Sequence, residues 1–244
     1  MGNELKNINN LFGSSDNQNN DEKIENSNDI FEKKEDINLL SEDDLFLIKG
    51  FKENYIYNIA NIMNKNIIIL GDSKIHKTKL FNIIFEKDNL NNNNEHNYAY
   101  FEEKNFVIDG YEINLNIWDT PGEESHKEAN KHFIKDCIIT YLCFHFKSQK
   151  SFDSIKNYYI KTVKEINGNN CLIILVGIKD EMFGDEDNSD NIPINNIKKY
   201  AEKQNILFYS VSLNDSNSVR YLFHDSIKKY LLLQTKKTFH KKNI

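Results

Sequence analysis

The chain has 244 residues, of which 39% are hydrophobic and 28% charged, and its formal net charge is −6 at pH 7. Nucleic-acid-binding proteins normally present a basic face, so we expect no nucleic-acid partner. The three cysteines stand in apolar runs without metal-ligand or disulfide spacing, which favours buried free thiols in a reducing compartment. Because no apolar run has the length of a transmembrane helix, we expect a cytoplasmic protein.

The N-terminal part is predicted to be a polar extension followed by one helix. Residues 1–40 are rich in Asn, Asp and Glu, so burial of apolar surface cannot offset the entropy of ordering and we expect disorder. Ser41 and Asp44 resemble a capping box, and apolar residues follow at helical spacing. The helical segment 41–63 is expected to pack on the rest of the chain or on a partner.

Strands and helices are predicted to alternate through residues 64–236. Buried strands are predicted at residues 66–70, 137–146, 171–177 and 206–211. Helical spacing is found at residues 79–85, 151–166, 194–204 and 217–234. A two-residue alternation on both sides of Asp109-Gly110 predicts a hairpin. The order predicts an α/β fold: a mostly parallel six-stranded sheet with one antiparallel hairpin strand and helices on both faces.

A phosphate-binding loop is the first candidate motif. Residues 71–78, GDSKIHKT, stand between the first strand and a helix and match G-x-x-x-x-G-K-[ST], except that His76 occupies the second glycine position. In such loops the lysine, here Lys77, reaches the outer phosphates, and the hydroxyl, here of Thr78, binds Mg²⁺. A left-handed backbone at His76 costs about 1–2 kcal/mol. A chance strand–turn–helix is the alternative.

Other residues of this segment are also predicted to bind phosphate or nucleotide. Lys74 either adds attraction for phosphate or is a solvated surface lysine. The full set of candidates here is Gly71, Ser73, Lys74, Ile75, His76, Lys77, Thr78 and Lys79.

The second motif, WDTPGEE, covers residues 118–124 and follows the second hairpin strand. Asp119 is predicted to bind Mg²⁺ through water, and Gly122 to donate its N–H to a terminal phosphate. The alternative is a strand that ends in a Pro-Gly turn.

Together these motifs resemble the Rab-like small GTPases of the Ras superfamily over about residues 65–236. WDTPGEE is similar to W-D-T-A-G-Q-E, LVGIKDE at residues 175–181 to L-V-G-N-K-x-D, and SLN at residues 212–214 to S-A-K. The resemblance implies a P-loop NTPase small G domain that binds GTP or GDP with Mg²⁺. It also implies protein effectors or an exchange factor that contact the switch regions. The residues implied in base binding are Lys179, Glu181, Ser212, Leu213 and Asn214.

Several positions depart from the family pattern. The switch I threonine falls at His96, which either contacts Mg²⁺ through one ring nitrogen or belongs to a loose Asn-rich loop. Glu123 stands in place of the catalytic glutamine, and a carboxylate cannot donate an amide hydrogen bond to orient water. Pro121 also stiffens this segment. Hydrolysis is therefore expected to be slow or lost.

In the base-reading motif, Ile178 replaces Asn and Glu181 replaces Asp. Glu181 is expected to accept the guanine protons, while Asp180 is expected to point the other way. The Leu213 N–H is expected to contact the guanine oxygen. These changes reduce discrimination in favour of guanine. His145 replaces an Asp of the family and has no assigned role.

Two functions remain open. One is a GTP-binding switch in vesicle and membrane traffic with weak or absent hydrolysis, and the other is a pseudo-GTPase scaffold that binds proteins without nucleotide cycling. A small P-loop kinase is a remote third, because lid arginines are missing. The sequence ends in a basic tail, residues 237–244, without a cysteine, so we expect no prenylation and at most weak peripheral contact with endomembranes.

Overall fold

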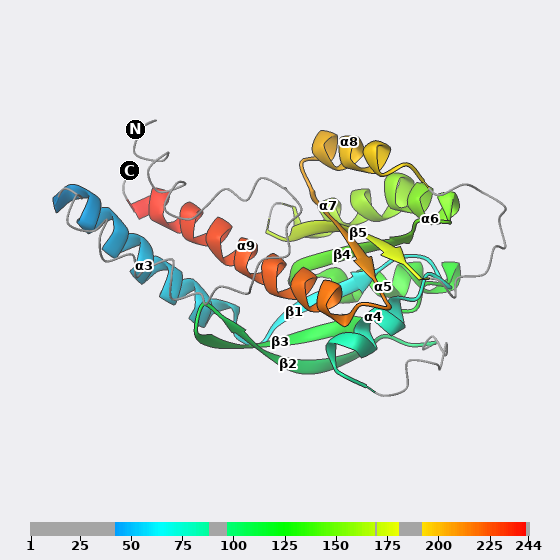
Figure 1. Cartoon of the computed structure of the whole chain (residues 1–244), viewed down its shortest axis with the longest axis horizontal. Helices are drawn as coiled ribbons and strands as arrows, with labels where there is room; N and C mark the ends of the chain where they lie inside the picture. The colour runs from blue at the N-terminus through cyan, green and yellow to red at the C-terminus, as the bar shows by residue number, and fades with distance from the viewer. Residues whose placement is uncertain (1–41, 88–96, 169, 181–191, 243–244) are drawn as a thin grey trace. The chain divides into compact units, whose positions relative to one another are not determined.

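The computed structural model describes residues 42–87, 97–168, 170–180 and 192–242 (Figure 1). The predicted disordered extension and the site candidates His96 and Glu181 lie outside these residues. The chain divides into two compact units. Of the described residues, the sheet unit comprises those between 62 and 106 and between 114 and 230, and the helical unit comprises 42–61, 107–113 and 231–242.

A six-stranded sheet has the strand order β2-β3-β1-β4-β5-β6. The strands are β1 Lys65–Leu70, β2 Tyr100–Ile108, β3 Tyr111–Asp119, β4 Cys137–His145, β5 Leu172–Lys179 and β6 Leu207–Ser212. Only β2 is antiparallel to its neighbour among these strands, which confirms the predicted sheet. Since five strands run in parallel, their carboxyl ends meet at one edge, where ligands of such sheets bind.

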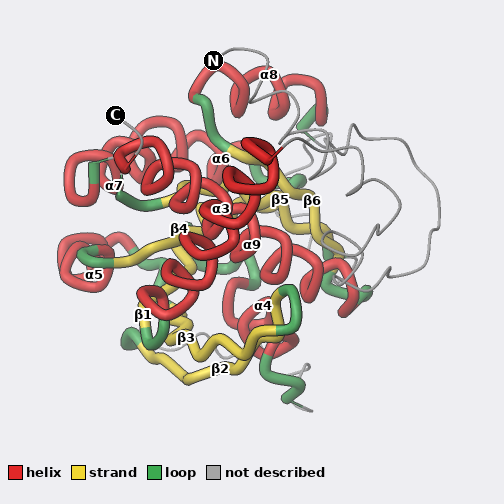
Figure 2. The backbone as a smooth tube through the Cα atoms, turned by 90° about the vertical axis from the view of Figure 1, so that its left-hand side faces the viewer, coloured by secondary structure: helices red, strands yellow, loops and turns green. Residues whose placement is uncertain are grey.

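The sheet is covered on both faces, as predicted. All nine residues of β4 are buried, which an apolar strand needs when helices lie above and below it. Leu142 and Phe144 pack into a cluster with the helices on one face. On the other face Tyr141 contacts Phe223, with ring centroids 4.9 Å apart, and hydrogen-bonds to Ser226 at 2.5 Å. Figure 2 shows α5 and α7 on one side of the sheet and α4 on the other.

The helices agree in part with the sequence predictions. They are α3 Glu42–Ile62, α4 Lys77–Ile84, η2 Glu124–His126, α5 Lys127–Ile134, α6 Gln149–Ser154, η3 Ile155–Tyr159, α7 Ile160–Asn167, α8 Ile194–Gln204 and α9 Ser216–Lys242. Neither η2 nor α5 was predicted. The single helix predicted at 151–166 is interrupted by the π-helical turn η3. Residues 237–242, predicted as a separate tail, instead continue α9.

In the helical unit, α3 packs on other parts of the same chain. Phe51 contacts Phe239 of α9, with ring centroids 6.0 Å apart. The buried Asn58 amide donates to the hydroxyls of Thr235 at 3.3 Å and Thr238 at 3.1 Å. Tyr55 donates to the Asp109 carboxylate in the hairpin turn at 2.6 Å, and burial raises the Tyr55 pKa above its usual value. The packing of this helix, left open by the sequence, is therefore intramolecular.

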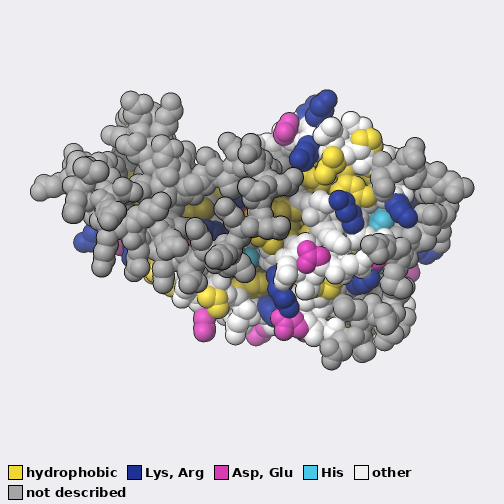
Figure 3. Space-filling view, in the orientation of Figure 1, with side chains coloured by type: hydrophobic (Ala, Val, Ile, Leu, Met, Phe, Trp, Pro, Cys, Tyr) yellow, Lys and Arg dark blue, Asp and Glu magenta, His cyan; other side chains and the backbone are white. Residues whose placement is uncertain are grey.

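On the face drawn in Figure 3, Lys and Arg side chains are interspersed with acidic and hydrophobic ones. Within the described ranges, no helix combines the length and the apolar character that crossing a bilayer would require.

Candidate functional site

The loop between β1 and α4 keeps the backbone path that phosphate binding needs. Gly71 has a φ of 151°, and a Cβ added there would lie 2.4 Å from the Cys143 carbonyl oxygen, so only glycine fits. His76 adopts the left-handed conformation, with φ 65° and ψ 34°, as its position in the motif demands. Lys74 is also left-handed, with φ 62°, and its side chain is exposed. His76 therefore has the left-handed backbone that the second glycine position of the motif demands.

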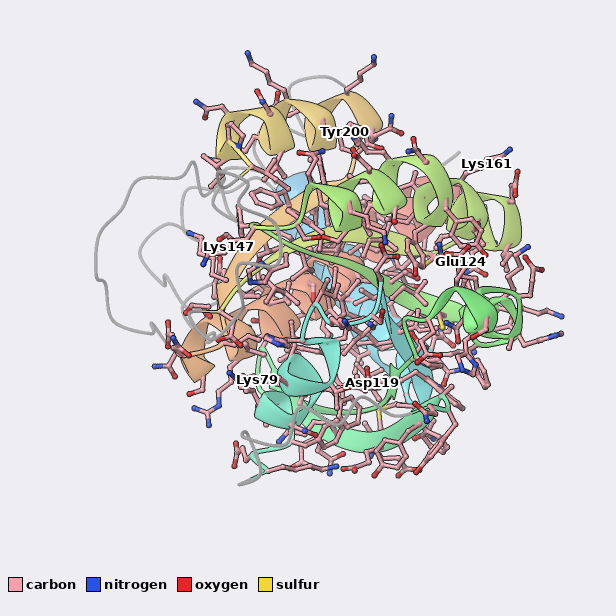
Figure 4. All side chains as sticks on the ribbon, turned by 90° about the vertical axis from the view of Figure 1, so that its right-hand side faces the viewer. Lys79, Asp119, Glu124, Lys147, Lys161 and Tyr200 are labelled. Atoms are coloured by element: carbon pink, nitrogen blue, oxygen red, sulfur yellow. The ribbon has the colours of Figure 1, made fainter. Side chains whose placement is uncertain are left out.

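The residues expected to bind a magnesium-bound polyphosphate lie close together in the structure. The Lys77 side chain is buried at the start of α4, and its Nζ donates to the Asp72 carbonyl oxygen at 2.6 Å. Thr78 Oγ1 donates to Asp119 Oδ2 at 2.6 Å, which joins α4 to the carboxyl end of β3. Figure 4 views this edge and labels Asp119 close to α4. A hydroxyl and a carboxylate at this spacing are suitable oxygen ligands for Mg²⁺.

The segment after β3 lies directly against the loop. A Cβ at Gly122 would lie 2.3 Å from the Ser73 nitrogen, and the Gly122 carbonyl oxygen accepts a hydrogen bond from the Ser73 N–H at 3.0 Å. The buried Asn130 amide donates to the Pro121 carbonyl at 2.8 Å and holds this segment from α5. Glu123 is extended, and its side chain is 59% exposed. Its carboxylate lies 3.8 Å from His126 Nε2 at the surface.

Asp180 lies in the site, contrary to the expectation that it points away. Its side chain is fully buried, and Oδ2 lies 2.8 Å from His76 Nδ1 and 2.9 Å from Lys79 Nζ. Asp180 follows the last residue of β5, so strand alternation no longer fixes its direction. The His76 ring is therefore engaged at the Asp180 side of the loop, with its centroid 6.5 Å from that of His145.

His145, which the sequence left without a role, supports this arrangement. It is 1% exposed at the end of β4, its Nδ1 accepts the Lys147 N–H at 3.1 Å, and its own N–H donates to Ser151 Oγ at 3.1 Å. Burial lowers its pKa to about 4, with a smaller contribution from His76 in the same direction. At neutral pH the ring is uncharged.

Asp72 was missed by the sequence analysis. Its carboxylate accepts hydrogen bonds from Ser154 Oγ at 2.5 Å and from the Tyr159 hydroxyl at 3.3 Å. Both donors stand at the π-helical turn, a feature that often accompanies functional sites. No motif signals this contact, because the partners are more than 80 residues away in the sequence.

A pocket of about 720 Å³ lies on the side of the site where the base is expected. Its lining includes Phe146, Lys179, Asp180, Ser212 and Asn214. The Lys179 Nζ lies 5.2 Å from the centre of the Phe146 ring. The volume is suitable for a small-molecule ligand.

The structure places the residues that were expected to contact the base as follows. The Leu213 N–H donates to the Lys179 carbonyl oxygen at 3.0 Å as a continuation of the strand pairing, so the expected guanine contact is already replaced by a backbone bond. Ile178 is fully buried and offers only an apolar side chain. The expected acceptor Glu181 lies outside the described residues.

Comparison with known proteins gives a consistent result. The model of the Ras family matches residues 66–232. The chain is 29% identical to the Ras-related protein RabQ of Dictyostelium discoideum over 133 residues, which is 54% of this chain and 63% of that protein, less than two thirds of its length. It is 27% identical to Ras-related protein Rab-21 of Geodia cydonium over 166 residues, 68% of this chain and 70% of that protein. It is 28% identical to Ras-related protein Rab-13 of Mesocricetus auratus, over 68% of this chain and 79% of that protein. The chain therefore belongs to the Ras family, as a divergent Rab-like member.

Proposed function

We propose that this chain binds a guanine nucleotide with Mg²⁺ and acts as a slowly hydrolysing, Rab-like switch in vesicle and membrane traffic. The observation that carries the proposal is the 2.6 Å contact between Thr78 and Asp119 beside the buried Lys77. Gly71 and Gly122 allow the loop to pack closely against β4 and against the segment after β3, since any side chain there would collide with neighbouring backbone. A bound Mg²⁺ would neutralise the charge of the phosphate oxygens.

Slow hydrolysis follows from Glu123 and from the position of the only arginine. A solvated carboxylate adds negative charge near the terminal phosphate and does not donate an amide hydrogen bond to water. Arg220 Nη2 lies 3.4 Å from Glu86 Oε1 on a solvent-exposed surface, so it is engaged outside the loop. A partner would have to supply an arginine and orient the water.

A row of aromatic side chains is the surface best suited to a protein partner. Phe101 of β2 stacks on Trp118 of β3 at 4.6 Å between ring centroids, and Trp118 contacts Phe133 of α5 at 4.9 Å. Phe101 is 43% exposed. Large aromatic groups that are accessible to solvent are typical anchors in protein interfaces. Trp118, in the middle of the row, directly precedes the Mg²⁺ candidate Asp119, so a change at the site is well placed to reach the row.

The second candidate function is a scaffold that binds proteins without nucleotide cycling. It is favoured by the internal hydrogen bonds of the phosphate loop, in which the Ser73 N–H donates to the Gly122 carbonyl oxygen and Lys77 Nζ donates to the Asp72 carbonyl oxygen. A loop bonded in this way does not need phosphate to satisfy these groups.

The experiment that separates the two functions measures nucleotide binding directly. The purified full chain is extracted to identify any bound nucleotide and is then titrated with GTP, GDP and ATP, with and without Mg²⁺. Mg²⁺-dependent binding of GTP that Lys77→Ala abolishes and Lys161→Ala leaves unchanged supports the switch. Lys161 is an exposed lysine on α7 and serves as the matched control. Failure to bind any of the three nucleotides leaves the scaffold.

A further inference from the structure

Two carboxylates, the partly buried Asp72 and the fully buried Asp180, contact the phosphate loop and the start of α4 from opposite sides. On one side, Asp72 within the loop accepts hydrogen bonds from Ser154 and Tyr159 of the α6–η3 segment. On the other side, Asp180 after β5 accepts a hydrogen bond from Lys79 in the first turn of α4, and its Oδ2 lies 2.8 Å from His76 Nδ1 in the loop. Side chains thus connect the loop to the α6–η3 segment on one side and to the end of β5 on the other.

Of the two carboxylates, that of Asp180 is the more deeply buried. The carboxylate is fully buried, and Oδ2 alone is shared by His76 Nδ1 and Lys79 Nζ within 2.9 Å. His76 has one of the two left-handed backbone conformations of the loop, so this close contact stands at a position whose conformation most side chains avoid. A buried charge whose partner is removed is strongly destabilising, because the remaining charge stays desolvated.

Asp72 lies at the other end of the loop. The Asp72 carbonyl oxygen accepts a hydrogen bond from Lys77 Nζ at 2.6 Å, and its carboxylate accepts hydrogen bonds from Ser154 and Tyr159. The next residue, Ser73, donates its N–H to Gly122 at 3.0 Å. Asp72 therefore positions both the lysine that would reach phosphate and the backbone that meets the segment after β3.

We propose that Asp72 and Asp180 are positioning residues that keep the phosphate loop in its binding shape when no nucleotide is present. The inference deepens the proposed function and rests on it for one point only, that the loop binds the phosphate groups of a nucleotide. A loop held by its own chain does not collapse when the ligand leaves, so the empty protein remains a folded, long-lived state that can contact partners.

Hydrogen exchange in the nucleotide-free full chain tests this inference. The informative amides are Ser73, bonded to Gly122, and Leu80, bonded to His76 in the first turn of α4. We expect both to be protected in the empty wild-type protein, since exchange requires that these bonds open. Asp180→Asn is expected to raise the exchange rate at Leu80 by about tenfold or more, equivalent to about 1.4 kcal/mol. Asp72→Asn is expected to do the same at Ser73.

Asp225→Asn is the matched control. Asp225 also accepts from one tyrosine, Tyr209, and pairs with one lysine, Lys229, but it lies on α9. It is expected to leave exchange at Ser73 and Leu80 unchanged. If an aspartate variant fails to fold, Tyr159→Phe removes one donor to Asp72 while leaving the carboxylate in place, and a smaller rise at Ser73 is expected.

The outcomes separate this inference from the proposed function. Rapid exchange at both amides in the empty wild-type protein, or equal exchange in the wild type and both aspartate variants, overturns the inference even if GTP binds tightly. Protection that is lost only in the two aspartate variants supports it, even if no nucleotide binds and the switch function fails.

Discussion

At the scale of single residues, His145 is expected to make the stability of the fold depend on pH. Burial lowers its pKa from 6.5 to about 4, so the folded state favours the neutral ring. As pH falls below 6.5 the unfolded chain binds a proton that the folded protein does not, and stability is lost until about pH 4. The loss is on the order of 3 kcal/mol over this range. Urea denaturation at several pH values between 7 and 4 measures it.

The control for this prediction is His145→Asn. The Asn side-chain oxygen can accept the Lys147 N–H as His145 Nδ1 does, but it does not titrate. The variant should lose less stability than the wild type between pH 7 and pH 4. The neighbours His76, Asp180 and Lys147 are present in both proteins, so their effects cancel in the comparison. An equal pH dependence in the two proteins would contradict the assignment to His145.

Glu123 is expected to limit hydrolysis. Glu123→Gln removes a negative charge and supplies an amide donor, so the single-turnover rate of GTP hydrolysis should rise by about tenfold, or about 1.4 kcal/mol in the barrier. The side chain is exposed, so the substitution should not disturb folding. Glu124→Gln, also exposed at the start of η2, is the neighbouring control and should leave the rate unchanged. A rate that is insensitive to Glu123→Gln would show that another group limits the reaction.

At the scale of elements, the contact between α3 and the hairpin turn should contribute to the stability of the helical unit. Tyr55→Phe deletes the hydroxyl that donates to Asp109 at 2.6 Å and leaves a carboxylate without this donor. The expected loss of stability of the helical unit is about 1–2 kcal/mol. It should appear as faster hydrogen exchange along α3.

Tyr221→Phe removes a hydroxyl from a side chain that is 60% exposed and serves as the control. Its effect should stay within about 0.5 kcal/mol. Equal exchange along α3 in the wild type and in Tyr55→Phe would show that apolar packing such as Phe51 on Phe239 holds this helix without the hydrogen bond.

The elements that the sequence predicted are those with a strong apolar pattern. Continuous apolar runs located β1, β4 and β5, and the Asp109-Gly110 turn located the hairpin between β2 and β3. By contrast α5, KEANKHFI, is mostly polar and lies after a Pro-Gly turn, so its pattern resembles a loop. The π-helical turn was also missed, because its extra residue does not alter the apolar spacing enough to be recognised.

The site was predictable where backbone geometry determines residue type. Gly71, Lys77, Thr78 and Asp119 were found from motif spacing, and the structure brings them together. Side-chain bonds between distant segments were not predictable. The direction of Asp180 depends on how the chain leaves β5, which strand alternation does not determine.

At the scale of the whole molecule, a Ras-family fold has kept the edge of the sheet where a nucleotide would lie while changing several of the side chains there. Asp72 within the loop and Asp180 after β5 contact it from two sides, and Lys179 lies beside Phe146 in the pocket. A chain of this kind can keep its fold through packing and still gain stability from a ligand. The size of that gain reports whether the nucleotide site is functional.

GTP with Mg²⁺ should therefore raise the thermal stability of the protein. A ligand that binds only the folded state stabilises it by about 2.7 kcal/mol when its free concentration is 100 times Kd. Removing Mg²⁺ with a chelator should reverse most of the shift, because Thr78 and Asp119 are placed to hold the ion. Thr78→Ala should respond weakly to GTP with or without Mg²⁺, whereas Thr162→Ala, which changes a buried threonine of α7, should lower the baseline stability but keep the shift. A wild-type protein whose unfolding temperature does not change with GTP and Mg²⁺ would contradict nucleotide binding, and the fold would then act through its protein surfaces alone.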